Sequence, residues 1–223
     1  MSARSLSSMP SNDEDKPFYA MGVNMAREMG QVVSNLLSKE EMDVMLQGFT
    51  AKMQGKIDED EMATMLNEHG PKLNELINAR VGDKLTLEKQ SGEDFAEKYL
   101  ADNSSAEKTD SGLVYHETQA GTGEQATLEC TVLVHYHGML VNGKVFDSSV
   151  ERGEPVKFPL RGVIPGWQEG VAKMNVGGKA TLVVPSSLAY GEQGSPPVIP
   201  PGATLQFDVE LLEVEGPAAA TSQ

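Results

Sequence analysis

Residues 130–137 read Cys-Thr-Val-Leu-Val-His-Tyr-His, and this stretch decides the fold of the second half of the chain. Successive side chains of a strand point to opposite faces, so the cysteine, both valines and the tyrosine share one face, and the remaining four residues share the other. Residues 205–211, Leu-Gln-Phe-Asp-Val-Glu-Leu, alternate in the same way. This alternation predicts half-buried antiparallel strands.

Turn and helix signals complete this half of the chain. Asn142-Gly143 is a turn signal between strand-like runs. Residues 166–174 form the single stretch of helical character in this part of the sequence. An antiparallel sheet wrapped on one short helix is an α+β arrangement, and we expect it over residues 112–215, followed by a flexible tail at residues 216–223.

The first half of the chain differs in composition. Residues 1–110 contain ten of the twelve Met but three of the twelve Pro and seven of the 22 Gly, which favours helices over turn-rich sheet. Ser38 with Glu41 forms a capping box that predicts the start of a helix, and Asp58 with Glu61 repeats this signal. Three amphipathic helices are predicted from apolar residues at spacings of three and four. Their apolar positions are Phe18, Met21, Met25, Met29, Val32 and Leu36; Met42, Met45, Phe49 and Met53; and Met62, Met65, Leu66, Leu73, Leu76, Ile77, Phe95 and Tyr99.

The third helical pattern is long enough to form an arm. Gly70-Pro71 interrupts it and predicts a kink, while Gly82 and Gly92 weaken it. From residue 71 to residue 100, a helix would reach about 45 Å, too long to be covered by two short helices of its own chain. We interpret the methionine-rich faces as core packing, part of it between two copies, with a promiscuous binding surface as the alternative.

These patterns divide the chain into two domains. We expect a flexible leader at residues 1–16 and an all-helical dimerisation domain with a long helical arm at residues 17–101. A linker of small polar residues follows at residues 102–111 and leads into the sheet domain.

Composition excludes several classes of protein. The net charge of -15, from 18 Lys and Arg against 33 Asp and Glu, would repel a phosphate backbone, so nucleic acid is not an expected partner. No apolar run approaches the roughly 18 residues that a membrane span requires. The leader lacks the apolar stretch of a signal peptide, which predicts a cytoplasmic protein, with a periplasmic or secreted protein as the alternative.

The sequence shows no arrangement of Ser, Cys or His residues suited to covalent catalysis or to metal binding. No Gly-x-Ser-x-Gly motif is present, and Ser186-Ser187 lacks an evident base. Cys130 lies within a predicted strand, as a small core residue rather than a nucleophile. His135 and His137 share a strand face as in some metal sites, but two exposed histidines are the better interpretation. We therefore expect no metal and no cofactor.

The remaining aromatic and apolar residues fall into six short blocks. They are Val134-His135-Tyr136-His137-Gly138, Phe146-Asp147-Ser148-Ser149, Arg152-Gly153-Glu154-Pro155, Val163-Ile164-Pro165-Gly166-Trp167, Leu188-Ala189-Tyr190-Gly191, and Ile199-Pro200-Pro201 followed by Phe207-Asp208-Val209-Glu210. In this order the blocks resemble the FKBP family of peptidyl-prolyl cis-trans isomerases, over about half of the chain.

The resemblance implies an enzyme that accelerates rotation about X-Pro bonds. This rotation meets a barrier of about 18 to 20 kcal/mol because amide resonance is lost at the twisted midpoint. An apolar aromatic pocket that favours the twisted, less polar amide lowers the barrier without a nucleophile. The implied partners are proline-containing peptides, unfolded client proteins and macrolides of the rapamycin and tacrolimus type.

The resemblance also assigns site residues. Trp167 is the expected pocket floor, and the Ile164 N–H and the Tyr190 hydroxyl are expected to bind substrate or inhibitor. The implied catalytic residues are Tyr136, Phe146, Asp147, Trp167, Tyr190 and Phe207. The implied substrate- and inhibitor-binding residues are Arg152, Val156, Val163, Ile164 and Ile199.

Three features of the implied pocket bear on specificity. Asp147 is the polar member of the implied pocket and is expected to be held by Arg152. Val156 stands where several relatives have an aromatic side chain, so that wall is expected to be thinner. The loop at residues 192–199 is expected to shape substrate preference.

The first half adds a second resemblance. Tyr19-Ala20-Met21-Gly22, an amphipathic helix pair and one long helix in front of such a domain are similar to the Mip-like branch of the family. Members of this branch are V-shaped homodimers joined through their N-terminal helices. The resemblance therefore implies a homodimer with two catalytic domains on long arms.

Two functions fit these observations. In the first, the protein is an active proline isomerase and a dimeric folding chaperone. In the second, it is a binding module or holdase that recognises proline-containing segments or clients with little turnover. The first is favoured because none of the six blocks is broken.

Overall fold

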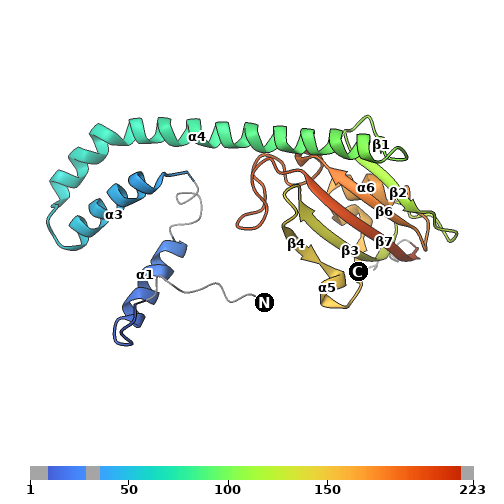
Figure 1. The fold of residues 1–223 in the computed structure, drawn as a ribbon, viewed down its shortest axis with the longest axis horizontal. Coiled ribbons are helices and arrows are strands. Elements are labelled where there is room, and N and C mark those ends of the chain that lie inside the picture. The colour runs from blue at the N-terminus through green and yellow to red at the C-terminus, as the bar shows by residue number, and fades with distance from the viewer. Residues whose placement is uncertain (1–9, 29–35, 217–223) are drawn as a thin grey trace, which may run out of the picture. The chain divides into compact units, whose positions relative to one another are not determined.

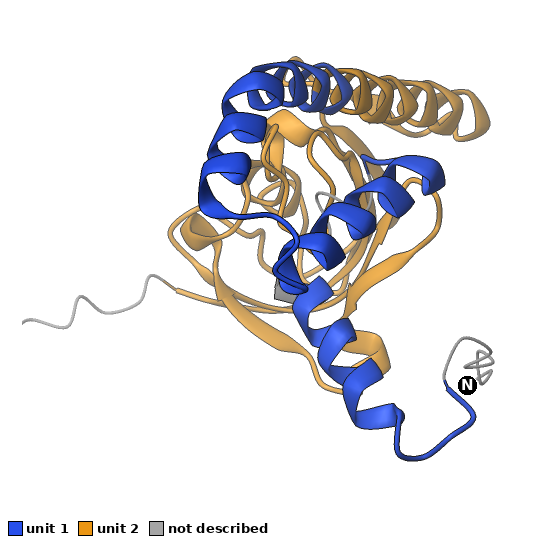
Figure 2. Ribbon diagram, turned by 90° about the vertical axis from the view of Figure 1, so that its left-hand side faces the viewer, with its two compact units in different colours: residues 1–81 blue, residues 82–223 orange. Residues whose placement is uncertain are grey.

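The computed structural model describes residues 10–28 and 36–216 of the chain. The chain forms two compact units, residues 1–81 and residues 82–223, whose boundary falls inside the long helix α4 (Glu59–Asp102). Figure 2 shows this division, with the last turns of α4 in the same unit as the sheet. The domain boundaries derived from the sequence stay predictions.

The described part of the first unit consists of helices. α1 (Lys16–Glu28) covers the first part of its predicted pattern, and residues 29–35 of that pattern lie outside the described residues. α3 (Lys39–Met53) begins at the predicted capping box. There the Glu41 N–H donates to Ser38 Oγ at 3.2 Å, and the Ser38 N–H donates to Glu41 Oε2 at 2.8 Å. The capping box is confirmed.

α4 also begins at its predicted capping pair. The Asp58 N–H donates to Glu61 Oε2 at 3.1 Å, and the Glu61 N–H donates to Asp58 Oδ1 at 2.8 Å. The helix continues through Gly70-Pro71 with Pro71 inside it, and the kink predicted there stays a prediction. A proline removes one backbone hydrogen bond, but the helix-favouring residues on both sides maintain the helix. Figure 1 shows the ribbon curving over its first turns before it straightens.

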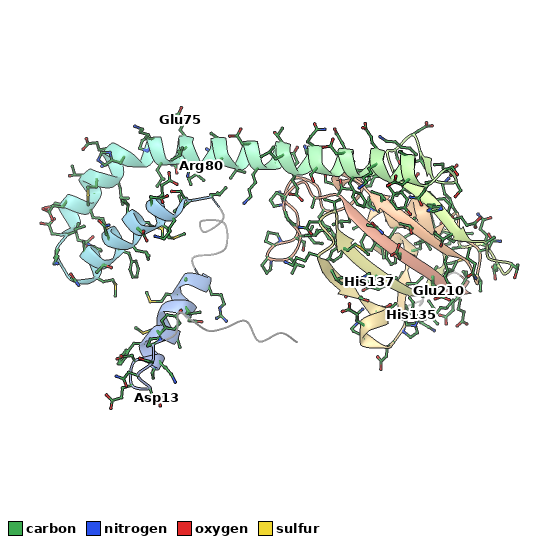
Figure 3. All side chains as sticks on the ribbon, viewed as in Figure 1. Asp13, Glu75, Arg80, His135, His137 and Glu210 are labelled. Carbon is green, nitrogen blue, oxygen red and sulfur yellow. The ribbon has the colours of Figure 1, made fainter. Side chains whose placement is uncertain are left out.

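Arg80 joins α4 to α3 within the first unit (Figure 3). Its Nη1 and Nη2 donate to the two carboxylate oxygens of Glu41, both at 2.7 Å, and Nη1 also donates to the Leu36 carbonyl oxygen at 2.8 Å. The hydrogen bonds from Arg80 and from the Ser38 backbone lower the pKa of Glu41 to about 2. The stabilising contribution of this carboxylate is therefore present above its ordinary pKa and is lost as the pH falls through about 2.

The second unit is built on an antiparallel sheet of seven strands. Their order is β1-β2-β6-β7-β3-β4, and β5 also pairs with β3. The two strands that the sequence predicts are present as β3 (Thr131–Leu140) and β7 (Leu205–Glu215), which pair with each other. Burial alternates along β3 as predicted. The other strands are β1 (Glu107–Lys108), β2 (Val114–Gln119), β4 (Val145–Ser148), β5 (Val156–Pro159) and β6 (Lys179–Val184).

One strand lies where the sequence predicts a linker. β1 falls inside residues 102–111 and pairs with Val114 and Tyr115 of β2. The polar composition of this segment suits an edge strand of two residues as well as a linker, because its side chains are exposed.

The predicted short helix is present as α6 (Pro165–Val171), which lies directly on β6. A Cβ atom at Gly166 would lie 2.3 Å from Val184 Cγ1, and one at Gly170 would lie 2.6 Å from Leu182 Cδ2. The two glycines therefore let the helix backbone approach the strand. The remaining short helices are α5 (Ser149–Arg152), η1 (Leu160–Gly162) and η2 (Ser186–Leu188). The α+β arrangement is confirmed.

The core of the second unit lies where α6 and the sheet meet. Its fully buried side chains include Leu113, Val132, Val134, Leu160, Val171, Met174, Leu182, Val184, Leu205 and Leu211. None of the helices in the described residues combines the length and the apolar character that crossing a membrane requires.

Candidate active site

Gly138 lies near the C-terminal end of β3, where three strands bring candidate site residues together. It pairs with Asp147 on β4 and with Phe207 on β7. The rings of Phe146 and Phe207 meet edge to face, with centroids 5.5 Å apart. A Cβ atom at residue 138 would lie 2.8 Å from Phe146 Cζ and 3.0 Å from Phe207 Cε1, so the glycine leaves the space that these rings occupy.

Trp167 is the centre of an aromatic cluster, which comprises Tyr136, Phe146, Phe158, Trp167 and Phe207. The Trp167 ring makes edge-to-face contacts with three of them, at centroid distances of 5.3 Å to Tyr136, 5.8 Å to Phe158 and 5.3 Å to Phe207. Such contacts contribute about 0.5 to 1.5 kcal/mol each beyond the buried area. The indole N–H of Trp167 is buried and has no acceptor in the described residues.

The start of α6 fixes the position of Trp167. Pro165 occupies the first turn, where its missing N–H costs no hydrogen bond. The Ile164 carbonyl oxygen accepts from the N–H of Trp167 at 2.9 Å and of Gln168 at 3.1 Å. The Gln168 side-chain amide donates to the Val163 carbonyl oxygen at 2.8 Å. The turn before α6 and the indole ring are thus positioned together.

Tyr136, Asp147 and Arg152 form a hydrogen-bonded polar group at one side of the aromatic cluster. The Tyr136 hydroxyl and Arg152 Nη1 donate to the two carboxylate oxygens of Asp147. Arg152 Nη2 donates to the Tyr136 hydroxyl oxygen at 3.1 Å, and the guanidinium carbon lies 5.7 Å from the centre of the Tyr136 ring. The contact expected between Asp147 and Arg152 is present.

These contacts also set the charges of the polar group. Burial and the hydrogen bond to Asp147 raise the pKa of Tyr136. Burial alone would raise the pKa of Asp147, but the hydrogen bonds from Tyr136 and Arg152 outweigh it and lower that pKa. The hydrogen bonds to Tyr136 and Asp147 raise the pKa of Arg152. Around neutral pH the group therefore contains a neutral phenol, a carboxylate and a guanidinium ion.

The other predicted site residues occupy different positions. Val156, Val163 and Ile164 are partly buried and pack against the core. Ile199 is buried within the core. Tyr190 is 42% exposed, and the structure shows no ring contact between it and the aromatic cluster in the described residues. The structure thus brings the predicted aromatic residues and the polar group together but leaves Tyr190 at the surface.

Comparison with known proteins decides the family. Residues 122–212 match the family model of "FKBP-type peptidyl-prolyl cis-trans isomerase", and residues 14–116 match that of "Domain amino terminal to FKBP-type peptidyl-prolyl isomerase". The chain is 42% identical over 214 residues to the FKBP-type peptidyl-prolyl cis-trans isomerase FkpA of Aeromonas hydrophila, which covers 92% of this chain and 78% of that protein. The chain belongs to the FKBP family. Its activity is peptidyl-prolyl cis-trans isomerisation, as the six blocks imply.

Two further relatives support this placement of the FKBP chain. The crystal structure of FkpA from Escherichia coli superimposes with a TM-score of 0.68 at 36% identity, over 92% of this chain and 98% of that chain. The peptidyl-prolyl cis-trans isomerase Mip of Coxiella burnetii is 51% identical over 104 residues, or 47% of this chain and 45% of that protein. The fold and the resemblance to Mip-like proteins are confirmed.

Sequence reasoning missed two residues of the candidate site. Phe158 contacts both Trp167 and Tyr136, the latter at a centroid distance of 6.0 Å. It lies two residues after Val156, on the same side of β5, so it supplies an aromatic ring next to the position where this chain has valine. The period of two along β5 could have indicated it. Gly138 lies inside a matched block, but only the structure shows that it leaves space for the Phe146 and Phe207 rings.

His135 and His137 lie on the second face of β3, opposite to Tyr136 and close to Glu210 of β7 in Figure 3. His135 Nδ1 lies 3.1 Å from Ser149 Oγ, and His137 Nδ1 lies 2.9 Å from Ser148 Oγ. No group of three or more side chains suited to a metal ion occurs in the described residues. Both histidines are half-buried rather than exposed as expected, and their hydrogen bonds hold the two serines where β4 ends and α5 begins.

The charges of the polar group predict how isomerisation depends on pH. The lowered pKa of Asp147 keeps it ionised, and the raised pKa of Tyr136 keeps it neutral, between about pH 5 and pH 9. The contribution of Asp147 to stability is lost only as the pH falls through its lowered pKa, and that of Tyr136 as the pH rises through its raised pKa. We expect kcat/KM for an X-Pro peptide to stay constant within this range. A bell-shaped profile centred within it would contradict a mechanism without proton transfer.

Proposed function

We propose that the aromatic cluster around Trp167, together with the polar group of Tyr136, Asp147 and Arg152, is the isomerisation site. The observation that carries this proposal is the set of three edge-to-face contacts on Trp167 beside a charged group with satisfied hydrogen bonds. A prolyl ring packs against the indole as the floor of the site. Phe146, Phe207 and Tyr136 enclose it as aromatic walls.

The chemistry of this site is differential binding. A planar X-Pro amide is strongly polar because of resonance, and the amide twisted by about 90° has lost this resonance. Apolar walls therefore favour the twisted amide over both planar forms, and each 1.36 kcal/mol of this preference accelerates rotation about tenfold. No covalent bond is formed or broken, so no nucleophile is required.

The remaining site residues orient the peptide. The Ile164 N–H and the Tyr190 hydroxyl donate hydrogen bonds to peptide carbonyl oxygens, while Val163 and Ile199 limit the space on the flanks. At Val156 the wall of the site is thinner, and the Phe158 ring lies next to it on the same side of β5. Macrolides of the rapamycin and tacrolimus type occupy the same surface and compete with peptide.

The first unit supplies a second part of the function, because its helices carry exposed apolar side chains. In α3, Leu46, Phe49 and Met53 are 49%, 40% and 68% exposed at spacings of three and four. α4 adds Leu66 and Leu73, which are 63% and 53% exposed. Exposed apolar side chains along helix faces are typical of protein interfaces, and a second copy of this chain is the proposed partner of these faces.

A dimer of this kind has two isomerisation sites and acts as a folding chaperone. Unfolded clients expose proline-containing segments, which bind at the two sites, while apolar surface that the dimer leaves open binds other parts of the client. The same surface supports the alternative function, a holdase with little turnover, because holding requires apolar contacts but no catalysis.

Client aggregation with and without rapamycin separates these functions. We expect the full chain to suppress light scattering of a chemically unfolded client and to keep part of this effect when rapamycin blocks isomerisation. Suppression lost entirely with rapamycin would assign the effect to the isomerase alone, and no suppression at all would refute the chaperone proposal. The location of the protein stays a prediction from the sequence, either cytoplasmic or, as the alternative, periplasmic or secreted.

A further inference from the structure

Within the second unit, one side of α4 packs against the rest of that unit. Leu85, Lys89 and Gly92 follow each other at spacings of four and three, which places them on one helix face. All three are partly or fully buried, whereas residues 86–87 and 90–91 between them are exposed. The same helix side continues to Tyr99, whose hydroxyl oxygen lies 2.9 Å from Nδ1 of His116 on β2.

Gly92 makes the closest approach on this face. It is the one buried residue of α4, and a Cβ atom there would lie 2.0 Å from Thr204 Oγ1 and 2.6 Å from Thr204 Cβ. Glycine inside a helix costs about 1 kcal/mol relative to alanine. The glycine is therefore explained by the contact with Thr204, which no larger residue allows in this geometry.

Leu85 and Lys89 contact the same region. A Cβ atom at Gly202 would lie 2.5 Å from Leu85 Cδ1 and 3.4 Å from Lys89 Cγ. Lys89 Nζ donates to Glu192 Oε1 at 2.6 Å and lowers the pKa of Glu192. This ion pair is largely exposed, so it contributes less than the packing of Leu85 and Gly92.

These contacts fall on the two ends of one loop, residues 190–204, which we call the Tyr190 loop. Its ends are joined because the Gly202 N–H donates to the Gly191 carbonyl oxygen at 3.0 Å. Its middle is held by two hydrogen bonds between Ser195 and Ile199, both at 2.9 Å. A loop that is tied internally at its base and its middle moves as a unit, and α4 contacts its base.

We propose that the α4 face of Leu85, Lys89 and Gly92 positions the Tyr190 loop and thereby sets which residue before proline the isomerase prefers. The inference rests on the site proposed above, because it assumes that Tyr190 and Ile199 contact the substrate. The three α4 residues are positioning residues and do not touch the peptide. The long helix is thus part of the specificity of the enzyme.

Two glycines of α4 provide a matched test. Gly92→Ala introduces a Cβ atom into the contact with Thr204, whereas a Cβ atom at Gly82 would meet nothing within 4 Å. Both substitutions favour the helix to the same degree. The readouts are kcat and KM for the peptides Ala-Leu-Pro-Phe and Ala-Ala-Pro-Phe in the full chain.

The expected result is a change of preference in one variant only. A misplacement of 1 Å costs up to about 100-fold, so a shift of a few tenths of an ångström should raise KM about 3- to 10-fold, unequally for the two peptides. Gly82→Ala should match the wild type. Adding Thr204→Gly to Gly92→Ala should restore the preference, because it removes the atoms that the new Cβ atom meets.

A second pair of variants tests the inference independently, in case Gly92→Ala does not fold. Leu85→Ala removes the contact with Gly202, and Leu87→Ala shortens a side chain that is 69% exposed on the same helix. Leu85→Ala should change the preference in the same direction, and Leu87→Ala should not. Folded Gly92→Ala and Leu85→Ala with wild-type KM and preference would overturn the inference. If Trp167→Leu also left turnover unchanged, the proposed site itself would fail, so the two failures are distinguishable.

Discussion

Replacing Trp167 by leucine is expected to lower kcat/KM for an X-Pro peptide by about 10- to 100-fold, because the floor of the site and its ring contacts are lost together. Trp167 makes three edge-to-face contacts, at 5.3 to 5.8 Å between centroids. A 10- to 100-fold loss corresponds to about 1.4 to 2.8 kcal/mol less stabilisation of the twisted amide relative to the planar amide. The measurement is the cis-to-trans relaxation of a peptide at several enzyme concentrations.

A control must separate loss of the site from loss of stability. Leu211→Ala shortens a fully buried side chain of β7 that is not one of the proposed site residues, and it should destabilise the fold by about 2 to 5 kcal/mol. At a temperature at which both variants are folded, Leu211→Ala should retain turnover and Trp167→Leu should not. Equal activity in the two variants would remove Trp167 from the site.

Phe49→Asp in α3 is expected to convert the proposed dimer to a monomer. Phe49 belongs to the apolar face of α3 and is 40% exposed in the single chain. In an interface its replacement would bury an unpaired carboxylate at a cost of at least about 3 kcal/mol, which raises the dissociation constant more than 100-fold. Light scattering coupled to size exclusion measures the mass directly.

Gln47→Asp is the matched control for this prediction. It introduces the same charge into α3 at an exposed position two residues before Phe49, which places it on the opposite side of the helix. It should leave the mass of a dimer unchanged. The Phe49→Asp monomer should lose suppression of client aggregation and retain peptide turnover, because the isomerisation site lies in the other unit. A wild-type protein with the mass of one chain would contradict the dimer proposal.

Local patterns predicted much of the fold. The period of two in residues 130–137 placed β3 with the correct face buried, and Ser38 with Glu41 placed the start of α3. These signals act over a few residues, so they are present in the sequence itself. Pro71 does not end α4, because the helix-forming preference of the residues on both sides outweighs the loss of one backbone hydrogen bond.

Contacts between distant segments could not be predicted in this way. Gly82 and Gly92 look alike in the sequence, where both indicate a weakened helix, yet only Gly92 faces Thr204 across more than a hundred residues of chain. The period of two along β5 could have placed Phe158 on the side of Val156, but not its contact with Trp167 on α6. The candidate site residues were predicted through matched blocks, whereas the roles of Gly138 and Gly92, which let two rings and a helix approach closely, were not.

The most direct test of the proposed site is the cis-to-trans relaxation rate of a Leu-Pro-Phe peptide with the purified protein, in the presence and absence of rapamycin. We predict that the wild-type protein accelerates relaxation, that rapamycin abolishes the acceleration, and that rapamycin changes the fluorescence of Trp167, the one tryptophan of the chain. Acceleration that persists with saturating rapamycin, or rapamycin binding without any change in Trp167 fluorescence, would contradict an isomerisation site built on this residue.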